Sequence, residues 1–330
     1  MPLIKKALRR RGFAKFLARA SLLLFFPVPI RAAPVLHPPC FANDALPIVA
    51  ATDSTGPMLT PWLQKLSDSL HADVGVAYRD LHTGRKFFFN EKMMMHAAST
   101  MKVPVMIEVF RQAQAGKFRL EDSLLVKNEF ASIVDGSLYA LDLGDDSDEL
   151  LYQAIGRKAT IHSLVEAMIT VSSNLATNML IELVAAPNIM NTLAQLGVHN
   201  MKVLRGVEDG KAFERGLNNR TDAHDLMLTL EALAQNRAAS PASCREMIEI
   251  LKRQKFRECI PAGLPPGVVA GNKTGSITAI DHDAAIIFPP GRQPCLMVVL
   301  TRGMPDHERA HDTIAHIARR LYEDLILRHD

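Results

Sequence analysis

The stretch Ser99-Thr100-Met101-Lys102 lies where an extended, strand-like segment runs into an amphipathic helix. If the helix begins at the serine, residues three positions apart share one face, so we expect the Lys102 amine beside the Ser99 hydroxyl. An adjacent amine can act as the base that activates a weak hydroxyl nucleophile. A Ser-x-x-Lys occurs about once by chance in a chain of this length, so its meaning depends on the residues that accompany it.

Two further short motifs follow in order along the chain. Ser172-Ser173-Asn174 falls in a break between two amphipathic helices, and Lys273-Thr274-Gly275 lies at the end of a predicted strand. Ser172 can pass a proton to a leaving nitrogen, and Asn174 can hydrogen-bond a substrate amide. Lys273 adds positive charge to the same cleft. Taken singly, each motif is explained by a helix cap or a solvated charge, whereas the three in this order favour a catalytic site.

From about Trp62 to its last residues the chain resembles the class A serine β-lactamase family, in which these motifs occur in this order. The resemblance implies hydrolysis of a β-lactam amide through an acyl-enzyme on Ser99, with Lys102 as base or proton shuttle. It also implies an oxyanion hole made by the backbone N–H groups of Ser99 and Ser276. Thr274 and Ser276 are implied to hold a substrate carboxylate.

Two positions depart from the pattern of the family. Ser173 stands where the family usually has aspartate, and His282, nine positions after Lys273, stands where many members carry an arginine. We expect His282 to contribute to the carboxylate pocket. A neutral imidazole binds a carboxylate more weakly than a guanidinium group does, so weaker substrate anchoring is expected than in members with the arginine.

The resemblance also implies a loop glutamate that activates the deacylating water, and two residues compete for this role. The string from Glu214 to Asn218 reproduces the Glu-x-x-Leu-Asn of the family, but it lies close to the next predicted helix, which starts at Thr221. Glu208, four residues after Leu204, lies at nearly the family's distance from both flanking helices. We favour Glu208, because spacing determines reach into the cleft and a short string can recur by chance.

The apolar periodicity predicts a two-lobed α/β (α+β) fold for a catalytic domain over 61–330. Strand patterns occur near both ends of this domain, and the pattern between Ser99 and about Ala234 is helical. A final helix is predicted from about Asp306 to Leu327. We expect an antiparallel sheet lobe from about 61–100 and 240–330, a mostly helical lobe from about 101–239, and the site between them. The predicted strands are 74–80, 86–89, 267–270, 283–288 and 295–301.

Residues 1–33 are typical of an export signal, because they hold eight basic residues, no acidic one and an apolar run from Ala20 to Ile30. That run is too short and too rich in proline to span a bilayer. The segment Arg10-Arg11-Gly-Phe-Ala-Lys15 resembles the twin-arginine pattern, and the basic cluster suits the general secretory route equally well. We expect a periplasmic or secreted protein with a proline-rich linker over 34–60 and no membrane contact after removal of the signal.

The composition argues against nucleic acid and against a metal site. The full chain carries a net charge of +3, but residues 1–33 hold eight positive charges, so the remainder is acidic. The four cysteines lack metal-ligand spacing, and Cys244 and Cys259 either pair or remain buried thiols. The string from His307 to His311 fits His-Glu-x-x-His, yet it is in phase with the apolar face of the last helix and lacks a well-spaced third ligand. We expect no metal and no organic cofactor.

Three functions share Ser99, Lys102 and Lys273. They are a β-lactamase, a D-alanyl-D-alanine peptidase that acts on cell-wall peptides, and a penicillin-binding sensor that stays acylated. They differ in how fast water releases the acyl-enzyme. A loop glutamate favours the β-lactamase, whose activity would serve antibiotic resistance or β-lactam catabolism. We expect a monomer whose partner is a small-molecule β-lactam or a cell-wall peptide.

Overall fold

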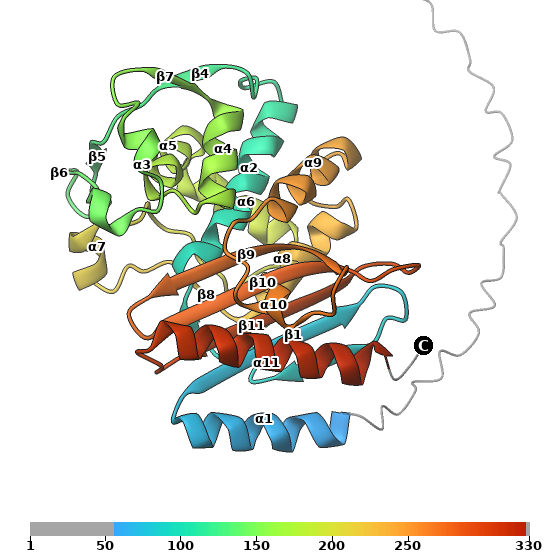
Figure 1. Cartoon of the computed structure of the whole chain (residues 1–330). Helices are drawn as coiled ribbons and strands as arrows, with labels where there is room; N and C mark the ends of the chain where they lie inside the picture. The colour runs from blue at the N-terminus through green and yellow to red at the C-terminus, as the bar shows by residue number, and fades with distance from the viewer. Residues whose placement is uncertain (1–55, 328–330) are drawn as a thin grey trace, which may run out of the picture. The chain divides into compact units, whose positions relative to one another are not determined.

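The computed structural model describes residues 56–327 (Figure 1). The expected signal at 1–33 and most of the expected linker lie outside the described residues. Helix α1 (Gly56–Leu70) includes residues 56–60, which were expected in the linker. The reason is apolar burial, because Leu59 and Leu63, four positions apart on one helix face, are both fully buried. Among residues 56–327, no helix combines the length and the apolar character that a membrane span requires.

The central element is a five-stranded antiparallel sheet with strand order β2-β1-β11-β10-β9. Strand β1 pairs directly with β11, from Asp73 opposite Arg302 to Asp80 opposite Cys295. The prediction of one antiparallel sheet built from both ends of the domain is therefore confirmed. Its strands are β1 (Asp73–Asp80), β2 (Lys86–Phe89), β9 (Val269–Ile277), β10 (Ile280–Phe288) and β11 (Cys295–Arg302).

Both faces of the sheet are buried, each against a different hydrophobic core. Successive side chains of a strand point to opposite faces, so Met297 and Val299 join the core under α1 and α11 (His307–Leu325), whereas Val298 and Leu300 join the core of the helical lobe. This is why β10 and β11 are apolar along most of their length. Figure 1 shows α1 and α11 below the sheet, on the side opposite the helical lobe.

The helical lobe is organised around α2 (Lys102–Gln114), in which every residue from Lys102 to Phe110 is buried. The predicted helix after Thr160 is confirmed, since the Thr160 hydroxyl accepts a hydrogen bond from the Ser163 N–H at 3.1 Å. The other helices are α3 (Glu149–Tyr152), α4 (Ile161–Thr170), α5 (Asn174–Val184), α6 (Ala186–Gln195), α7 (Gly210–Glu214), α8 (Ala223–Ala234), α9 (Pro241–Lys252) and α10 (Ile260–Gly263).

Three two-stranded sheets complete the part of the chain that the structure describes. One of them matters for the site, because β3 (Met95–His96) pairs with β8 (Arg220–Thr221) and leads directly into the turn that carries Ser99. The others pair β4 (Ser123–Leu125) with β7 (Lys158–Thr160) and β5 (Phe130–Ala131) with β6 (Leu138–Tyr139).

Candidate active site

Ser99 lies in a 3₁₀ turn, Ala98–Met101, which continues directly into α2. The α-helix therefore begins at Lys102. The sequence pattern favoured a start at Ser99, three residues earlier. Ala98 has a φ of 45°, in the left-handed region. Such a conformation costs a non-glycine residue about 1–3 kcal/mol and persists only where the surrounding structure enforces it, often at active sites.

Strand β9 lies tightly against this turn. A Cβ added to Gly275 would lie 2.9 Å from the Ser99 backbone nitrogen and 3.0 Å from that of Thr100. No side chain fits there, which explains the glycine that ends Lys-Thr-Gly. The close approach brings the next residue, Ser276, into the cavity that Ser99 also lines. The backbone N–H groups expected to form an oxyanion hole thus belong to two segments in direct contact.

Two fully buried lysines meet at Ser172, in the break between α4 and α5. Lys273 Nζ lies 3.0 Å from Ser172 Oγ, and Lys102 Nζ lies 3.2 Å from the same oxygen and 2.6 Å from the Ser172 carbonyl. Burial lowers the pKa of Lys102 to about 7. Burial and the neighbouring Lys102 charge hold the pKa of Lys273 well below its usual value. Amines with low pKa values can accept protons near neutral pH.

The resting partners of Lys102 differ from the expectation. Its amine donates to Ser172 and to the Asn174 side chain and, within the described chain, forms no hydrogen bond with Ser99. The turn of 3₁₀ helix before Lys102 changes the relative direction of the two side chains. Catalytic hydrogen bonds are often formed only once substrate is bound. The pairing of Ser99 with Lys102 therefore stays a prediction.

Ser173 provides the cap of α5. Its hydroxyl accepts a hydrogen bond from the Ala176 N–H at 3.2 Å, and the residue is fully buried. Serine is as good an N-cap as aspartate, so this departure from the family pattern leaves the helix start intact. Ser172, just before it, has a φ of 59°, a second left-handed residue in the site.

The side chain of Asn174 connects Lys102 to Glu208. Asn174 Oδ1 accepts from Lys102 Nζ at 2.8 Å, and Nδ2 donates to Glu208 Oε1 at 2.9 Å. If Asn174 is to hydrogen-bond a substrate amide, as expected, this bond must replace the bond to Lys102 or to Glu208, or share an atom with it. Glu208 Oε2 accepts from the Asp142 N–H at 3.0 Å. Burial raises the pKa of Glu208, and these hydrogen bonds act in the opposite direction.

Glu208, and not Glu214, lies beside the other candidate residues. Glu208 lines a cavity of about 790 Å³ together with Ser99 and Asn174. It is half-buried, with a φ of 60°. Glu214 is exposed at the end of α7 and, among the described residues, has no hydrogen bond to Ser99, Lys102 or Asn174. The assignment of the deacylating base to Glu208 stays a prediction, and Glu208 is the candidate that lies within the cavity of Ser99.

Asp146 supports the site and was not identified from the sequence. Its Oδ2 accepts from the backbone N–H groups of Asn174 at 2.9 Å and Leu175 at 2.8 Å, which fixes the first turn of α5. It lies 28 positions before Asn174. No local sequence pattern links a capping residue to a helix so far along the chain.

His282 lines the same cavity as Ser99 and Ser276, but its ring is bonded to the backbone. It is fully buried on β10, and its ring nitrogens lie 2.9 Å from the His96 carbonyl oxygen and 3.2 Å from the Thr301 backbone nitrogen. Burial lowers its pKa, which keeps the ring neutral. The expectation that His282 binds the substrate carboxylate stays a prediction, and such a contact would have to compete with these backbone hydrogen bonds. The ring also supports β3, just before the turn that carries Ser99.

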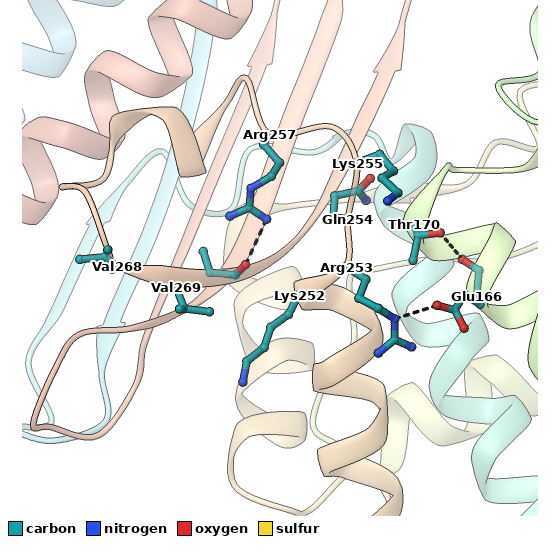
Figure 2. Close-up of a pocket in the computed structure, with 11 residues that line it drawn as sticks. Glu166, Thr170, Lys252, Arg253, Gln254, Lys255, Arg257, Val268 and Val269 are labelled. Carbon is teal, nitrogen blue, oxygen red and sulfur yellow. Dashed lines mark hydrogen bonds and ion pairs between the residues drawn. The ribbon is translucent and has the colours of Figure 1, made fainter.

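A second hollow, of about 580 Å³, lies between α9, the start of β9 and the end of α4 (Figure 2). Arg253 donates to the Glu166 carboxylate at 2.7 Å, and Arg257 approaches the Ala270 carbonyl at 3.5 Å. Lys252 and Lys255 also line it, but none of its lining residues is serine, cysteine or histidine. Its lining residues in the described part of the chain are mostly cationic and include no paired nucleophile and base, unlike the cavity around Ser99.

Within residues 56–327, one group of acidic and histidine side chains is compact enough for a metal ion. Ligand atoms of Asp222, His224 and Asp225 lie within 4.8 Å of one another. Their oxygens already accept backbone hydrogen bonds, Asp222 from the Asp225 N–H at 2.7 Å and Asp225 from the Met201 N–H at 2.9 Å. These contacts cap α8 and hold the preceding loop, so they account for the cluster without an ion.

The cysteines in the described part of the chain are free thiols. Cys244, Cys259 and Cys295 are all buried. Of the two alternatives for Cys244 and Cys259, the buried thiols are therefore correct and the disulfide is wrong. Burial raises the pKa of Cys295 to about 12, which leaves its thiol protonated and unreactive.

Comparisons with known proteins find similar sequences and similar structures over most of the chain. The model of the β-lactamase enzyme family matches residues 59–325. A β-lactamase from Streptomyces albus G is 25% identical over 259 residues, which is 77% of this chain and 80% of that protein. A solved β-lactamase from Sphaerobacter thermophilus has a TM-score of 0.69 and 26% identity over 83% of this chain and 97% of its own. An ancestral class A β-lactamase has a TM-score of 0.70 and 26% identity, covering 80% and 99%.

Proposed function

Since this chain belongs to the β-lactamase enzyme family and is a class A serine hydrolase, we propose that it opens the β-lactam amide through an acyl-enzyme on Ser99. One observation carries the assignment of the residues. A continuous row of hydrogen bonds joins Lys273, Ser172, Lys102, Asn174 and Glu208. The row borders the cavities that Ser99 lines. Within this row, Lys102 is the base for acylation and Glu208 is the base for deacylation.

In acylation, Ser99 Oγ attacks the lactam carbonyl carbon and its proton passes to the Lys102 amine. With a pKa of about 7, about half of this amine is neutral at pH 7. The oxyanion of the tetrahedral intermediate accepts hydrogen bonds from the N–H groups of Ser99 and Ser276. Ser172, which contacts both lysines, delivers its proton to the lactam nitrogen as the carbon–nitrogen bond breaks, and it receives in turn the proton that Lys102 took from Ser99.

In deacylation, Glu208 takes a proton from water, and the resulting hydroxide attacks the ester carbon. Ser99 Oγ leaves and regains a proton, which Glu208 gives up, so both residues return to their starting state. Asn174 holds Glu208 Oε1, and the Asp142 N–H holds Oε2, so the carboxylate is oriented by two donors. Burial raises its pKa, which makes it a stronger base than an exposed carboxylate.

Lys273, Thr274, Ser276 and Asn174 are the residues that we assign to substrate binding. Lys273 lies behind this edge of the cavity and donates to the Ser172 hydroxyl, and the Thr274 and Ser276 side chains line the cavity from β9. Hydroxyl donors at a strand edge suit a carboxylate. Hydrolysis of the antibiotic would confer resistance. On the basis of residues 1–33, we further propose export to the periplasm or the medium, which the mass of the mature N-terminus would test.

The decisive experiment measures turnover of a chromogenic cephalosporin. We expect steady hydrolysis with many product molecules per enzyme, and a Ser99→Ala variant without turnover or covalent adduct. A single burst stoichiometric with protein would instead indicate a penicillin-binding sensor. Release of D-alanine from a cell-wall peptide faster than β-lactam opening would indicate the peptidase.

A further inference from the structure

The loop that carries Glu208 is attached to the turn between β5 and β6 through the next residue, Asp209. Asp209 Oδ1 accepts a hydrogen bond from Ser132 Oγ at 2.8 Å, and Oδ2 accepts from the Ile133 N–H at 3.0 Å. Both side chains are buried, since Asp209 is 1% exposed and Ser132 is 5% exposed. Hydrogen bonds to a carboxylate that is shielded from water are stronger than neutral ones. Asp209 therefore firmly joins two segments that lie 77 positions apart in the sequence.

Capping of α7 explains only part of these contacts. Asp209 is the N-cap residue of α7, and its Oδ1 also accepts from the Ala212 N–H at 3.1 Å. A cap needs one acceptor oxygen, which serine or asparagine supplies as well as aspartate does. The bonds to Ser132 and Ile133 lie outside the helix and occupy both oxygens. They are the reason why a carboxylate, and not merely a capping residue, suits this position.

Glu208 has a strained backbone and lies between two fixed residues. Its φ is 60°, in the left-handed region, and a non-glycine residue keeps this conformation only where the surrounding structure enforces it. On one side, the Asn178 side chain accepts from the Val207 N–H at 2.6 Å and donates to the Val207 carbonyl at 3.0 Å. On the other side lies Asp209. Loss of either attachment lets the backbone of Glu208 relax, which moves its carboxylate.

The hairpin of β5 and β6 also leads to a group that holds the Glu208 side chain. The Asp142 N–H, three residues after the end of β6, donates to Glu208 Oε2 at 3.0 Å. The Tyr139 hydroxyl, on β6 itself, donates to the Val207 carbonyl at 3.3 Å. A shift between hairpin and loop therefore displaces Glu208 at its backbone and at its carboxylate. A displacement of about 1 Å in a reacting group costs about 100-fold in rate.

We propose that Asp209 is a positioning residue for deacylation, which holds Glu208 in its productive place through the turn between β5 and β6. The proposal rests on the proposed function, in which Glu208 activates the water. Acylation depends instead on Lys102, which is held by Ser172 and Asn174. Loss of the Asp209 bonds should therefore slow release of the acyl-enzyme much more than its formation.

Two substitutions remove these bonds and keep the cap of α7. In Asp209→Asn, one acceptor oxygen remains for the three donors that Asp209 serves. Stopped-flow with a chromogenic cephalosporin should show deacylation slowed between about tenfold and about 100-fold, with acylation within about twofold of the wild-type rate. Ser132→Ala removes one donor, and we expect deacylation to slow about tenfold. It also provides the test if Asp209→Asn does not fold.

The matched control is Lys211→Gln. Lys211 Nζ joins the same loop to the same turn, at 2.8 Å from Asp135 Oδ2, but the two side chains are 53% and 45% exposed. Exposed ion pairs contribute little, so both rates should stay within about twofold of wild type. Equal slowing of acylation and deacylation by Asp209→Asn and Ser132→Ala, or deacylation at the wild-type rate in both, would overturn the proposal.

A double variant shows whether Asp209 acts through Glu208. In Glu208→Gln, the residual release of the acyl-enzyme no longer uses the carboxylate, so adding Asp209→Asn should change that rate by less than about twofold. A residue with a merely structural role would slow release by the same factor with and without Glu208. That result would also overturn the proposal.

Failure of the proposed function would give a different pattern. No turnover by the wild type, or normal turnover by Glu208→Gln, would contradict the role of Glu208 and not the attachment of its loop. Hydrogen exchange of the amides of residues 206–212 then tests the attachment directly. We expect faster exchange in Asp209→Asn than in the wild type and in Lys211→Gln, because the strained loop is released. Equal exchange in the three proteins would refute the positioning role.

Discussion

Replacement of Glu208 by glutamine should separate the two halves of the reaction. Glutamine keeps the shape and one acceptor oxygen, but it cannot take a proton from water. Loss of a general base lowers a rate about 10²- to 10⁴-fold, which corresponds to about 3–5 kcal/mol on the deacylation barrier. Lys102, the base for acylation, stays buried in this variant, so its pKa stays low. Acylation should therefore continue while release of the acyl-enzyme nearly stops.

The cost to folding should be small, because Glu208 accepts one hydrogen bond from Asn174 and one from Asp142, and glutamine retains one of them. Loss of the other amounts to about 1 kcal/mol. Rapid mixing with a chromogenic cephalosporin should give one product per enzyme and then a very slow phase, and mass spectrometry should find the adduct on Ser99. The matched control is Glu214→Gln, on the exposed end of α7, with rates within about twofold of wild type. Normal turnover by Glu208→Gln, or a trapped acyl-enzyme in Glu214→Gln, would refute the assignment.

Three further outcomes follow from the geometry of the site. The acylation rate, measured as the burst in stopped-flow, should rise with pH through about 7 and then level off. The reason is that Lys102 acts as the neutral amine and its pKa is about 7. A flat profile from pH 5.5 to 9 would exclude Lys102 as the base. Gly275→Ala should lower kcat/KM about tenfold or more and reduce the Tm. The Cβ of the new alanine would lie 2.9 Å from the Ser99 backbone nitrogen, and overpacking costs about 1–3 kcal/mol. Unchanged kcat/KM and Tm would show that β9 can move away from the Ser99 turn. Reducing agent should leave the Tm unchanged, because Cys244, Cys259 and Cys295 are free and buried, whereas a drop would reveal a disulfide.

The architecture was largely predictable from the sequence because sheet burial leaves a strong apolar pattern. The hairpin of β1 and β2, the helix capped by Thr160 and the helix at the C-terminal end of the domain all have clear periodicity. Strand β9 was predicted too short, over 267–270, although it extends to Ile277. Its second half faces the cavity and carries lysine, threonine and glycine, which interrupt the apolar pattern that marks a strand.

The site was predictable in its residue types but less so in its contacts. Motif order located Ser99, Ser172 and Lys273, because their chemistry requires these side chains. Contacts between distant segments have no sequence pattern, so the cap provided by Asp146 was missed. His282 was assigned to the carboxylate pocket from its position alone, whereas its orientation depends on the backbone of β3 and β11.

The place of β11 in the sheet has a consequence for how the protein is made. Asp73 at the start of β1 is joined to Arg302 at the end of β11, 229 positions later, and β11 is the central strand. During synthesis the β1–β2 hairpin must therefore remain without its main partner until almost the whole chain has left the ribosome. Contacts of such long range slow folding, and the unpaired strand edge is exposed to aggregation in the meantime. A chain released early would lack the middle of its sheet and not merely an edge.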